Sequence, residues 1–195
     1  VLYRLMSGTA AGRSEGILGI ITEVRSNFAR CRRIASTMVC VFKSDEEAFA
    51  LPNKILKAGI DPTSIEFMDN EALQLTCKFL DMKMPHVDDG CDYVIVTVES
   101  FNEDDSDRKM EQLCDLAEAN GSIDEFEADA RIWKLRKQFA EAARSVDKMF
   151  QTEDFVVPLD KIPDITKQLP ELRRKYDLYC VTVATSATAT FTSCL

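Results

Sequence analysis

Histidine is almost absent from this sequence, because His86 is the only one among 195 residues. A Ser-His-Asp or Cys-His mechanism would have to use that residue, and a metal site built from several histidines is excluded. His86 follows Met84-Pro85 and precedes a Val-Asp-Asp-Gly turn. Segments rich in turn residues run over protein surfaces, so we expect a surface histidine rather than a catalytic one.

Long apolar runs and an excess of positive charge are also lacking. No stretch of about 18 or more apolar residues occurs, so no membrane-spanning helix is expected, and Val1–Met6 shows no signal-peptide pattern. The 24 basic residues are outnumbered by 33 acidic ones, which gives a net charge of −9. Partners with dense negative charge, namely nucleic acids and anionic membrane surfaces, are therefore not expected.

Cysteines with the spacing of a metal or redox site are missing as well. The seven cysteines are odd in number and no C-x-x-C pair occurs. Several lie within apolar runs, where a thiol behaves as a small hydrophobic side chain, so we expect reduced thiols and a cytoplasmic location. The acidic run Glu103–Asp107 lacks the glycine and the terminal glutamate of a calcium-binding loop. It is expected to begin a helix, and no metal site is predicted.

What the sequence does contain is an alternation of predicted strands and helices. Its 46% apolar content over 195 residues suffices for a sizeable core in one or two domains. β-branched and aromatic runs predict the strands, and apolar residues at helical spacing predict the helices. The strands are Ile34–Phe42, Ser64–Met68, Tyr93–Val98, Phe155–Val157 and Leu178–Ala184; the helices are Ser44–Ala58, Asn70–Met84, Asp104–Asn120, Phe126–Met149 and Pro163–Tyr176. This order fits a doubly wound parallel sheet or a ferredoxin-like α+β sheet.

Helix ends are predicted from capping residues. A Ser-x-x-Glu capping box formed by Ser44 and Glu47 should begin the first helix, and Gly59 should end it. Asp104 and Asp105 should cap the third helix, and Gly121 should stop it.

The stretch Ser14–Val24 carries the strongest motif. Two glycines bracket an apolar pair and lead into a β-branched run, a pattern in which backbone N–H groups at the mouth of a strand can approach an anion closely. The stretch resembles the S-E-G-x-L-G-I-I-T-E-V segment of FAD-linked oxidases of the glycolate oxidase/D-lactate dehydrogenase type. The resemblance continues to about Ala184, through Ile60-Asp61-Pro62, Glu66-Phe67-Met68-Asp69, Trp133 with Arg136, and Glu153–Pro163.

This resemblance implies a domain organisation and a cofactor. In the family the Ser-Glu-Gly segment closes the FAD-binding domain around the flavin and leads into a cap domain, an antiparallel sheet covered by helices. We therefore expect an α+β fold with three segments. Residues 1–30 should be a C-terminal remnant of an α+β FAD-binding domain, and residues 31–184 should form a ferredoxin-like cap or substrate domain. Residues 185–195 should be a tail. The residues expected to contact FAD through backbone groups are Ser14, Gly16, Gly19, Ile20 and Ile21. The family's glycine-rich phosphate loop lies upstream of them, so this chain alone is expected to hold FAD weakly.

Arg136 is the residue that the resemblance assigns to the substrate. It lies three residues after Trp133, and the family has a matching Trp-x-x-Arg whose arginine reaches the substrate carboxylate above the flavin. A guanidinium suits this role because it can clamp a carboxylate with two parallel hydrogen bonds. The alternative is an exposed helix arginine paired with Glu141 or another acid, which would stabilise the helix only slightly.

The last stretch departs from the family pattern. The base is usually sought in a His-x-Gly-Asp-Gly-Asn-x-His motif after the last cap strand, where this chain has Thr185, Ala187, Thr188, Ala189, Thr190 and Thr192 in place of the named residues. Threonine is not a base at neutral pH and is a poor metal ligand, so no catalytic residue is assigned. Three interpretations stay open: a silenced site, an unrelated Thr/Ala-rich strand, or a stretch whose recorded residues are not the true ones.

Two functions from different classes remain. The first is a partial chain of an FAD-dependent 2-hydroxy acid oxidoreductase of the glycolate or D-lactate class, with hydride transfer from a small 2-hydroxy acid to flavin N5 and an electron-accepting partner protein. The second is a flavin-free α+β binding or assembly module that retains only the cap scaffold. They differ in whether a glycine-rich loop exists upstream in the full-length protein or in a partner chain.

Overall fold

The computed structural model describes residues 34–146, 167–177 and 181–185, the strands at 152–156 and 190–194, and the single residues 161, 164 and 179. These residues form one antiparallel sheet of seven strands in the order β4-β1-β3-β2-β6-β7-β5. The strands are β1 (Ile34–Phe42), β2 (Pro62–Met68), β3 (Asp92–Ser100), β4 (Asp124–Glu127), β5 (Thr152–Val156), β6 (Val181–Thr185) and β7 (Thr190–Cys194). The helices are α1 (Asp45–Lys57), α2 (Asn70–Leu80), α3 (Glu103–Glu118), α4 (Ala130–Val146) and α6 (Leu169–Tyr176).

The first four strands have the ferredoxin-like arrangement. Their order in the sheet is β4-β1-β3-β2, with α1 connecting β1 to β2 and α3 connecting β3 to β4. One extra helix, α2, lies between β2 and β3 in the chain, and β6, β7 and β5 extend the sheet beyond β2. The predicted α+β class with an antiparallel sheet is confirmed, and the alternative of a doubly wound parallel sheet is wrong because every strand pair is antiparallel.

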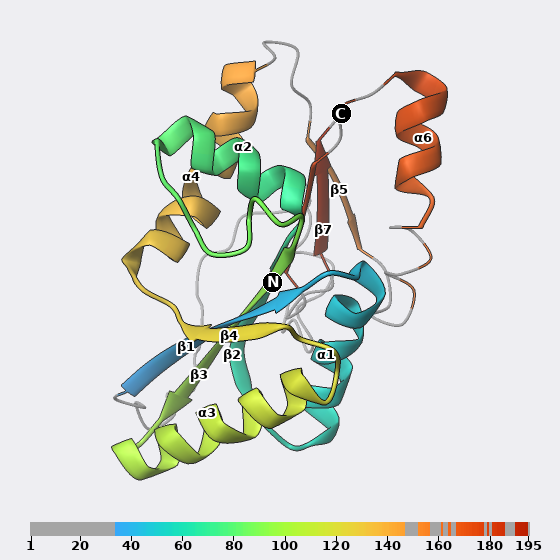
Figure 1. Cartoon of the computed structure of the whole chain (residues 1–195). Coiled ribbons are helices and arrows are strands. Elements are labelled where there is room, and N and C mark those ends of the chain that lie inside the picture. Colours follow the sequence, from blue (N-terminus) through green and yellow to red (C-terminus); the bar gives the residue numbers. More distant parts are fainter. Residues whose placement is uncertain are drawn as a thin grey trace, which may run out of the picture. The chain divides into compact units, whose positions relative to one another are not determined.

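Helices cover the sheet on both faces (Figure 1). On one face α2 and α4 pack against Val39, Val41, Tyr93, Ile95, Val181 and Val183. On the other face α1 and α3 pack against Met38, Cys40, Phe67, Val94, Val96 and Ala184. Because successive side chains of a strand point to opposite faces, a strand between two helix layers must be apolar throughout. β3 comes close to this condition, since all of its nine residues except Glu99 are buried and its stretch Tyr93–Val96 is apolar.

One helix boundary was predicted wrongly at Phe126. Residues Asp124–Glu127 form β4, which pairs with β1, and α4 begins only at Ala130. The Phe126 ring packs edge-on against Tyr93 with its centroid 5.8 Å away, and Ala128 N donates to Thr37 O at 2.8 Å. These tertiary contacts, which the local pattern does not encode, hold the segment extended.

The predicted caps are partly wrong as well. Ser44 makes no side-chain capping bond, and α3 begins after Asn102, whose side chain accepts from Asp105 N at 2.8 Å. Helix α2 ends at Leu80 rather than at Met84, because Asp81 adopts a left-handed conformation with φ 50°. The prediction for Gly59 is confirmed, because it follows α1 with φ +76°, a conformation that a side chain disfavours.

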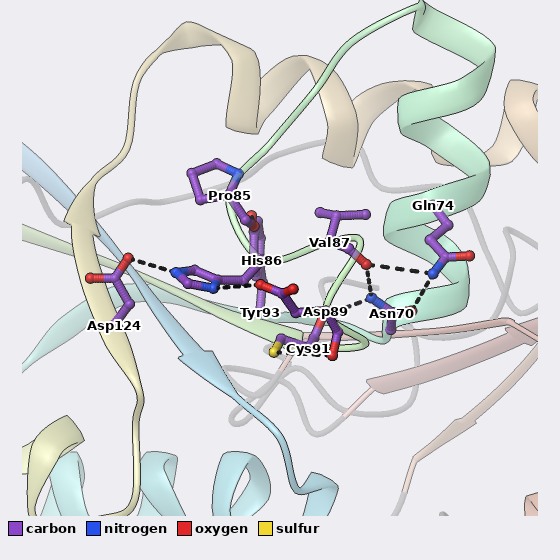
Figure 2. A network of polar contacts seen from close by, with 9 residues as sticks. All are labelled: Asn70, Gln74, Pro85, His86, Val87, Asp89, Cys91, Tyr93 and Asp124. Atoms are coloured by element: carbon purple, nitrogen blue, oxygen red, sulfur yellow. Dashed lines mark hydrogen bonds and ion pairs between the residues drawn. The ribbon is translucent and has the colours of Figure 1, made fainter.

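The predicted loop around His86 is held by a polar network (Figure 2). The His86 ring lies between two carboxylates, with Nδ1 3.0 Å from Asp89 and Nε2 3.1 Å from Asp124 on β4. Asn70, the first residue of α2, donates from Nδ2 to Val87 O at 2.8 Å and to Cys91 O at 3.1 Å. His86 is one-third exposed, which agrees with the expectation of a surface loop, but its contact with Asp124 ties that loop to β4.

None of the helices within the described residues has both the length and the apolar character needed to cross a bilayer.

The Asn70 amide should contribute measurably to stability, because its removal leaves two backbone carbonyls of the loop without this donor. We expect Asn70→Ala to lower the free energy of unfolding by about 2 kcal/mol, measured by urea denaturation. Gln74→Ala is the matched control, because the Gln74 amide bonds mainly to Asn70 Oδ1 on the exposed side of the helix. Equal losses for the two variants would contradict this account of the network.

Candidate functional site

Arg136 lies on α4 at the edge of the helix face that packs on the sheet. That face consists of Ile132, Leu135, Phe139, Ala142 and Ala143, which recur at helical spacing and are buried. Because Arg136 adjoins this stripe, its side chain runs toward the sheet, and 26% of it is exposed. The sequence therefore places a guanidinium at the border between the packed interface and solvent.

The guanidinium meets two polar side chains from adjacent strands. Arg136 Nε donates to Glu66 Oε2 at 3.0 Å, and Arg136 Nη2 lies 3.5 Å from Thr185 Oγ1. Thr185 Oγ1 donates to the same Glu66 oxygen at 2.7 Å. Glu66 on β2 and Thr185 on β6 are direct partners in the antiparallel register, so their side chains lie on the same face of the sheet. We call Glu66, Arg136 and Thr185 the Arg136 cluster.

The Arg136 cluster matches one part of the alternative expectation, because Arg136 pairs with an acid, namely Glu66. Arg136 does not pair with Glu141, whose carboxylate instead accepts from Arg144 at 2.8 Å. The structure brings Arg136 beside Thr185, the position at which the resemblance places the first histidine of the family motif. Glu66 was missed as a site residue, although a charged side chain between the buried Ile65 and Phe67 must point to the opposite face of β2.

The residues predicted to contact FAD, which are Ser14, Gly16, Gly19, Ile20 and Ile21, lie outside the described residues. Of the predicted site residues, the described part of the chain therefore contains only Arg136. One group there has metal-ligand spacing: Cys114 and Glu118 on α3 and Glu125 on β4 hold donor atoms within 4.8 Å of one another. Glu118 is exposed, and acidic groups at a surface commonly adopt such spacing without an ion, so we assign it no function.

The sequence was compared with models of known families. Residues 33–188 match the family described as FAD linked oxidases, C-terminal domain. The chain belongs to this family. The match begins just before β1 and ends just beyond β6, so it includes the whole Arg136 cluster.

Curated relatives of this C-terminal domain are longer proteins. The chain is 26% identical over 185 residues to a D-lactate dehydrogenase of Anaerostipes hadrus, covering 90% of this chain and 38% of that protein. It is also 26% identical over 170 residues to glycolate oxidase subunit GlcD of Escherichia coli K12, covering 85% of this chain and 34% of that subunit. The chain thus spans a little over a third of the length of these relatives.

Solved structures show the same fold at low sequence identity. An alkyldihydroxyacetonephosphate synthase matches with a TM-score of 0.61 at 13% identity, over 84% of this chain and 36% of that one. A 4-ethylphenol oxidase from Gulosibacter chungangensis matches with a TM-score of 0.61 at 8% identity, over 84% of this chain and 39% of that one. At such identities the likeness extends to the fold alone.

A second polar region of the domain is a cleft of about 480 Å³ at the end of β2 and the start of α2. Its lining includes Lys43, Asp45, Asp69, Asp92, Arg173 and Thr182. Asp69 caps α2 by accepting from Ala72 N at 2.8 Å, and it also accepts from Thr182 N at 2.6 Å. The cleft and the Arg136 cluster share no residue. Successive side chains of β2 point to opposite faces of the sheet, so Phe67 of the cleft lies on the α1 side and Glu66 of the cluster lies on the α4 side.

Burial perturbs the two aspartates of the cleft. It raises the pKa of Asp69 to about 7, against the opposing effect of its hydrogen bond from Ala72 N. Burial, followed by the hydrogen bond and negative charge of Asp45, also raises the pKa of Asp92 well above that of an ordinary carboxyl group. Asp92 is only 6% exposed and accepts from Asn70 N at 2.8 Å. The neutral form of Asp92 is therefore favoured at neutral pH.

The raised pKa of Asp92 predicts a pH-dependent loss of stability. The folded protein keeps a proton on Asp92 that the unfolded chain releases above the ordinary carboxyl pKa of about 4. The free energy of unfolding therefore falls as the pH rises from the pKa of Asp92 in the unfolded chain to its pKa in the folded protein. Asp92→Asn mimics the protonated carboxyl group. We expect it to be more stable than the wild type at pH 8, by on the order of 2 kcal/mol, with little difference at pH 4.

Thermal or urea unfolding of both proteins across this pH range measures the effect. Asp107→Asn, at an exposed aspartate of α3, is the matched control and should not change the pH dependence. A stability difference between wild type and Asp92→Asn that stays constant with pH would show that Asp92 is not protonated in the folded protein.

Proposed function

We propose that this chain is the cap portion of an FAD-dependent 2-hydroxy acid oxidoreductase of the glycolate or D-lactate class, in which Arg136 binds the substrate carboxylate. The observation that carries the proposal is the Arg136 cluster. It presents a partly exposed guanidinium, anchored to the sheet, on the domain that matches the FAD-linked oxidases. Relatives named D-lactate dehydrogenase and glycolate oxidase subunit support the substrate class.

The chemistry divides between the cofactor and this chain. FAD, when bound, supplies the acceptor for the hydride that leaves the carbon bearing the substrate hydroxyl. The chain's own contribution is to bind and orient. A bidentate arginine–carboxylate pair fixes both the position and the rotation of a small hydroxy acid, so that its C–H bond is held toward the acceptor. Ser14, Gly16, Gly19, Ile20 and Ile21 would contribute backbone contacts to the flavin.

Other parts of the proposal concern the setting of the protein. A cytoplasmic location is supported by buried free thiols at Cys40, Cys77 and Cys91, which fit a reducing compartment. An electron-accepting partner protein would reoxidise the flavin.

One observation favours the second function, a flavin-free binding or assembly module. Thr185 occupies the first histidine position of the family motif, and its hydroxyl donates to Glu66. A threonine committed in this way cannot take the proton of a substrate hydroxyl. In this reading the Arg136 cluster stabilises the junction of α4 with the sheet and binds no substrate.

Substitution of Arg136 in the full-length protein separates the two functions. We expect Arg136→Ala to raise KM for D-lactate or glycolate by about 10- to 100-fold, because a charge-assisted hydrogen-bond pair to the substrate is lost. Arg136→Lys should retain part of the affinity, since it keeps the charge but not the planar fork. Steady-state kinetics measures both variants, and Arg144→Ala, which removes an exposed ion pair on the same helix, is the control. Unchanged KM and kcat for Arg136→Ala would refute the carboxylate assignment.

A further inference from the structure

Glu66 occupies an unusual position for a carboxylate. Only 12% of its side chain is exposed, and it projects from the middle of β2 toward the side of α4 that faces the sheet. A buried carboxylate is unfavourable unless it is paired and hydrogen-bonded. Glu66 Oε2 accepts both from Arg136 Nε and from Thr185 Oγ1, so the pair is stable only when the guanidinium keeps one orientation.

The two contacts of Arg136 use one edge of its guanidinium. A guanidinium is planar, and its Nε–H and one Nη–H point along the same side edge. Glu66 and Thr185 lie on that edge, at 3.0 Å from Nε and 3.5 Å from Nη2. Within the described residues, no hydrogen-bond acceptor is found for Arg136 Nη1. The end formed by Nη1 and Nη2 carries the pair of N–H groups that a second carboxylate needs for the bidentate geometry, and 26% of the Arg136 side chain is exposed.

We propose that Glu66 is a positioning residue that, together with Thr185, fixes the Arg136 guanidinium so that its Nη1–Nη2 end faces the substrate carboxylate. This inference rests on the proposed function of Arg136. Without Glu66 the long arginine side chain would sample several rotamers, and each productive encounter would have to order it again. Glu66 acts through Arg136 alone and does not touch the substrate.

A merely structural ion pair would behave differently in a double-mutant cycle. If Glu66 acts by orienting Arg136, its removal matters for substrate binding only while Arg136 is present. If Glu66 only stabilises the fold, its removal shifts the unfolding temperature and leaves KM unchanged. Another acid–arginine pair of the chain supplies the matched control, because Glu71 accepts from Arg173 Nη1 at 2.8 Å and neither residue belongs to the Arg136 cluster.

The experiment compares Glu66→Ala, Arg136→Ala and the double variant in the full-length enzyme, with D-lactate and glycolate as substrates. We expect Glu66→Ala to raise KM about tenfold, with a smaller change in kcat, and to have no further effect on KM in the Arg136→Ala background. Glu66→Gln, which keeps an oxygen acceptor at the same reach, should restore KM to within about threefold of the wild type. Glu71→Ala should leave KM unchanged.

The outcomes distinguish this inference from the proposed function. An unchanged KM in Arg136→Ala would overturn both. Either of two results would overturn the positioning role alone. One is a raised KM in Arg136→Ala with an unchanged KM in Glu66→Ala. The other is an equal effect of Glu66→Ala on KM in the presence and in the absence of Arg136. If Glu66→Ala does not fold, Glu66→Asp decides: it keeps the charge but is one methylene group shorter, and a wild-type KM in that variant would contradict the proposal.

Discussion

The burial of β3 on both faces is the constraint on which the rest of this domain depends. Its side chains alternate between the layer of α2 and α4, met by Tyr93 and Ile95, and the layer of α1 and α3, met by Val94 and Val96. A sheet with such a central strand must be covered by helices on both sides. Helix α4 belongs to one of these covering layers. Its packing on the sheet therefore fixes the position and rotation of the helix that carries Arg136.

The two polar regions follow from the same alternation. Along β2 the buried side chains of Ile65 and Phe67 fill one face, so Glu66 must enter the other, under α4. Glu66 therefore joins the Arg136 cluster, whereas Phe67, its neighbour in the chain, points to the other face and lines the aspartate-lined cleft. Burial also explains why Glu66 and Asp69 are hydrogen-bonded and why the neutral form of Asp92 is favoured: little water reaches these side chains to solvate a bare charge.

Much of the fold could be predicted from the sequence. The runs Ile34–Phe42 and Tyr93–Val98 identify β1 and β3, because Met38–Phe42 of β1 and nearly all of β3 are buried on both faces, where a strand needs no alternation. The short β4 was not predicted, because the residue types of Asp124–Glu127 are not typical of a strand. This segment is extended because it pairs with the free edge of β1 and because Phe126 packs against Tyr93. A capping side chain likewise depends on geometry that residue type alone does not determine, as Ser44 and Asn102 show.

The site was predictable to a smaller extent. Arg136 was found through its spacing from Trp133 and the family resemblance, whereas Glu66 and Thr185 join it through a strand register that the sequence does not reveal. Residues brought together over such separations become visible only when the sheet order is known. The raised pKa of Asp92 arises in the same way, because both its burial, which is the main cause, and its approach to Asp45 require the folded sheet in which β1 and β3 pair.

The central claim is that this domain serves a flavin enzyme that oxidises small 2-hydroxy acids. The most direct measurement is an anaerobic titration of the full-length protein, purified with FAD, in which the visible flavin absorbance is followed as D-lactate or glycolate is added. The account predicts that the flavin band bleaches with one of these substrates and recovers when an electron acceptor is admitted. A protein that binds no flavin, or whose flavin stays oxidised with both, would contradict it and would favour the binding or assembly module.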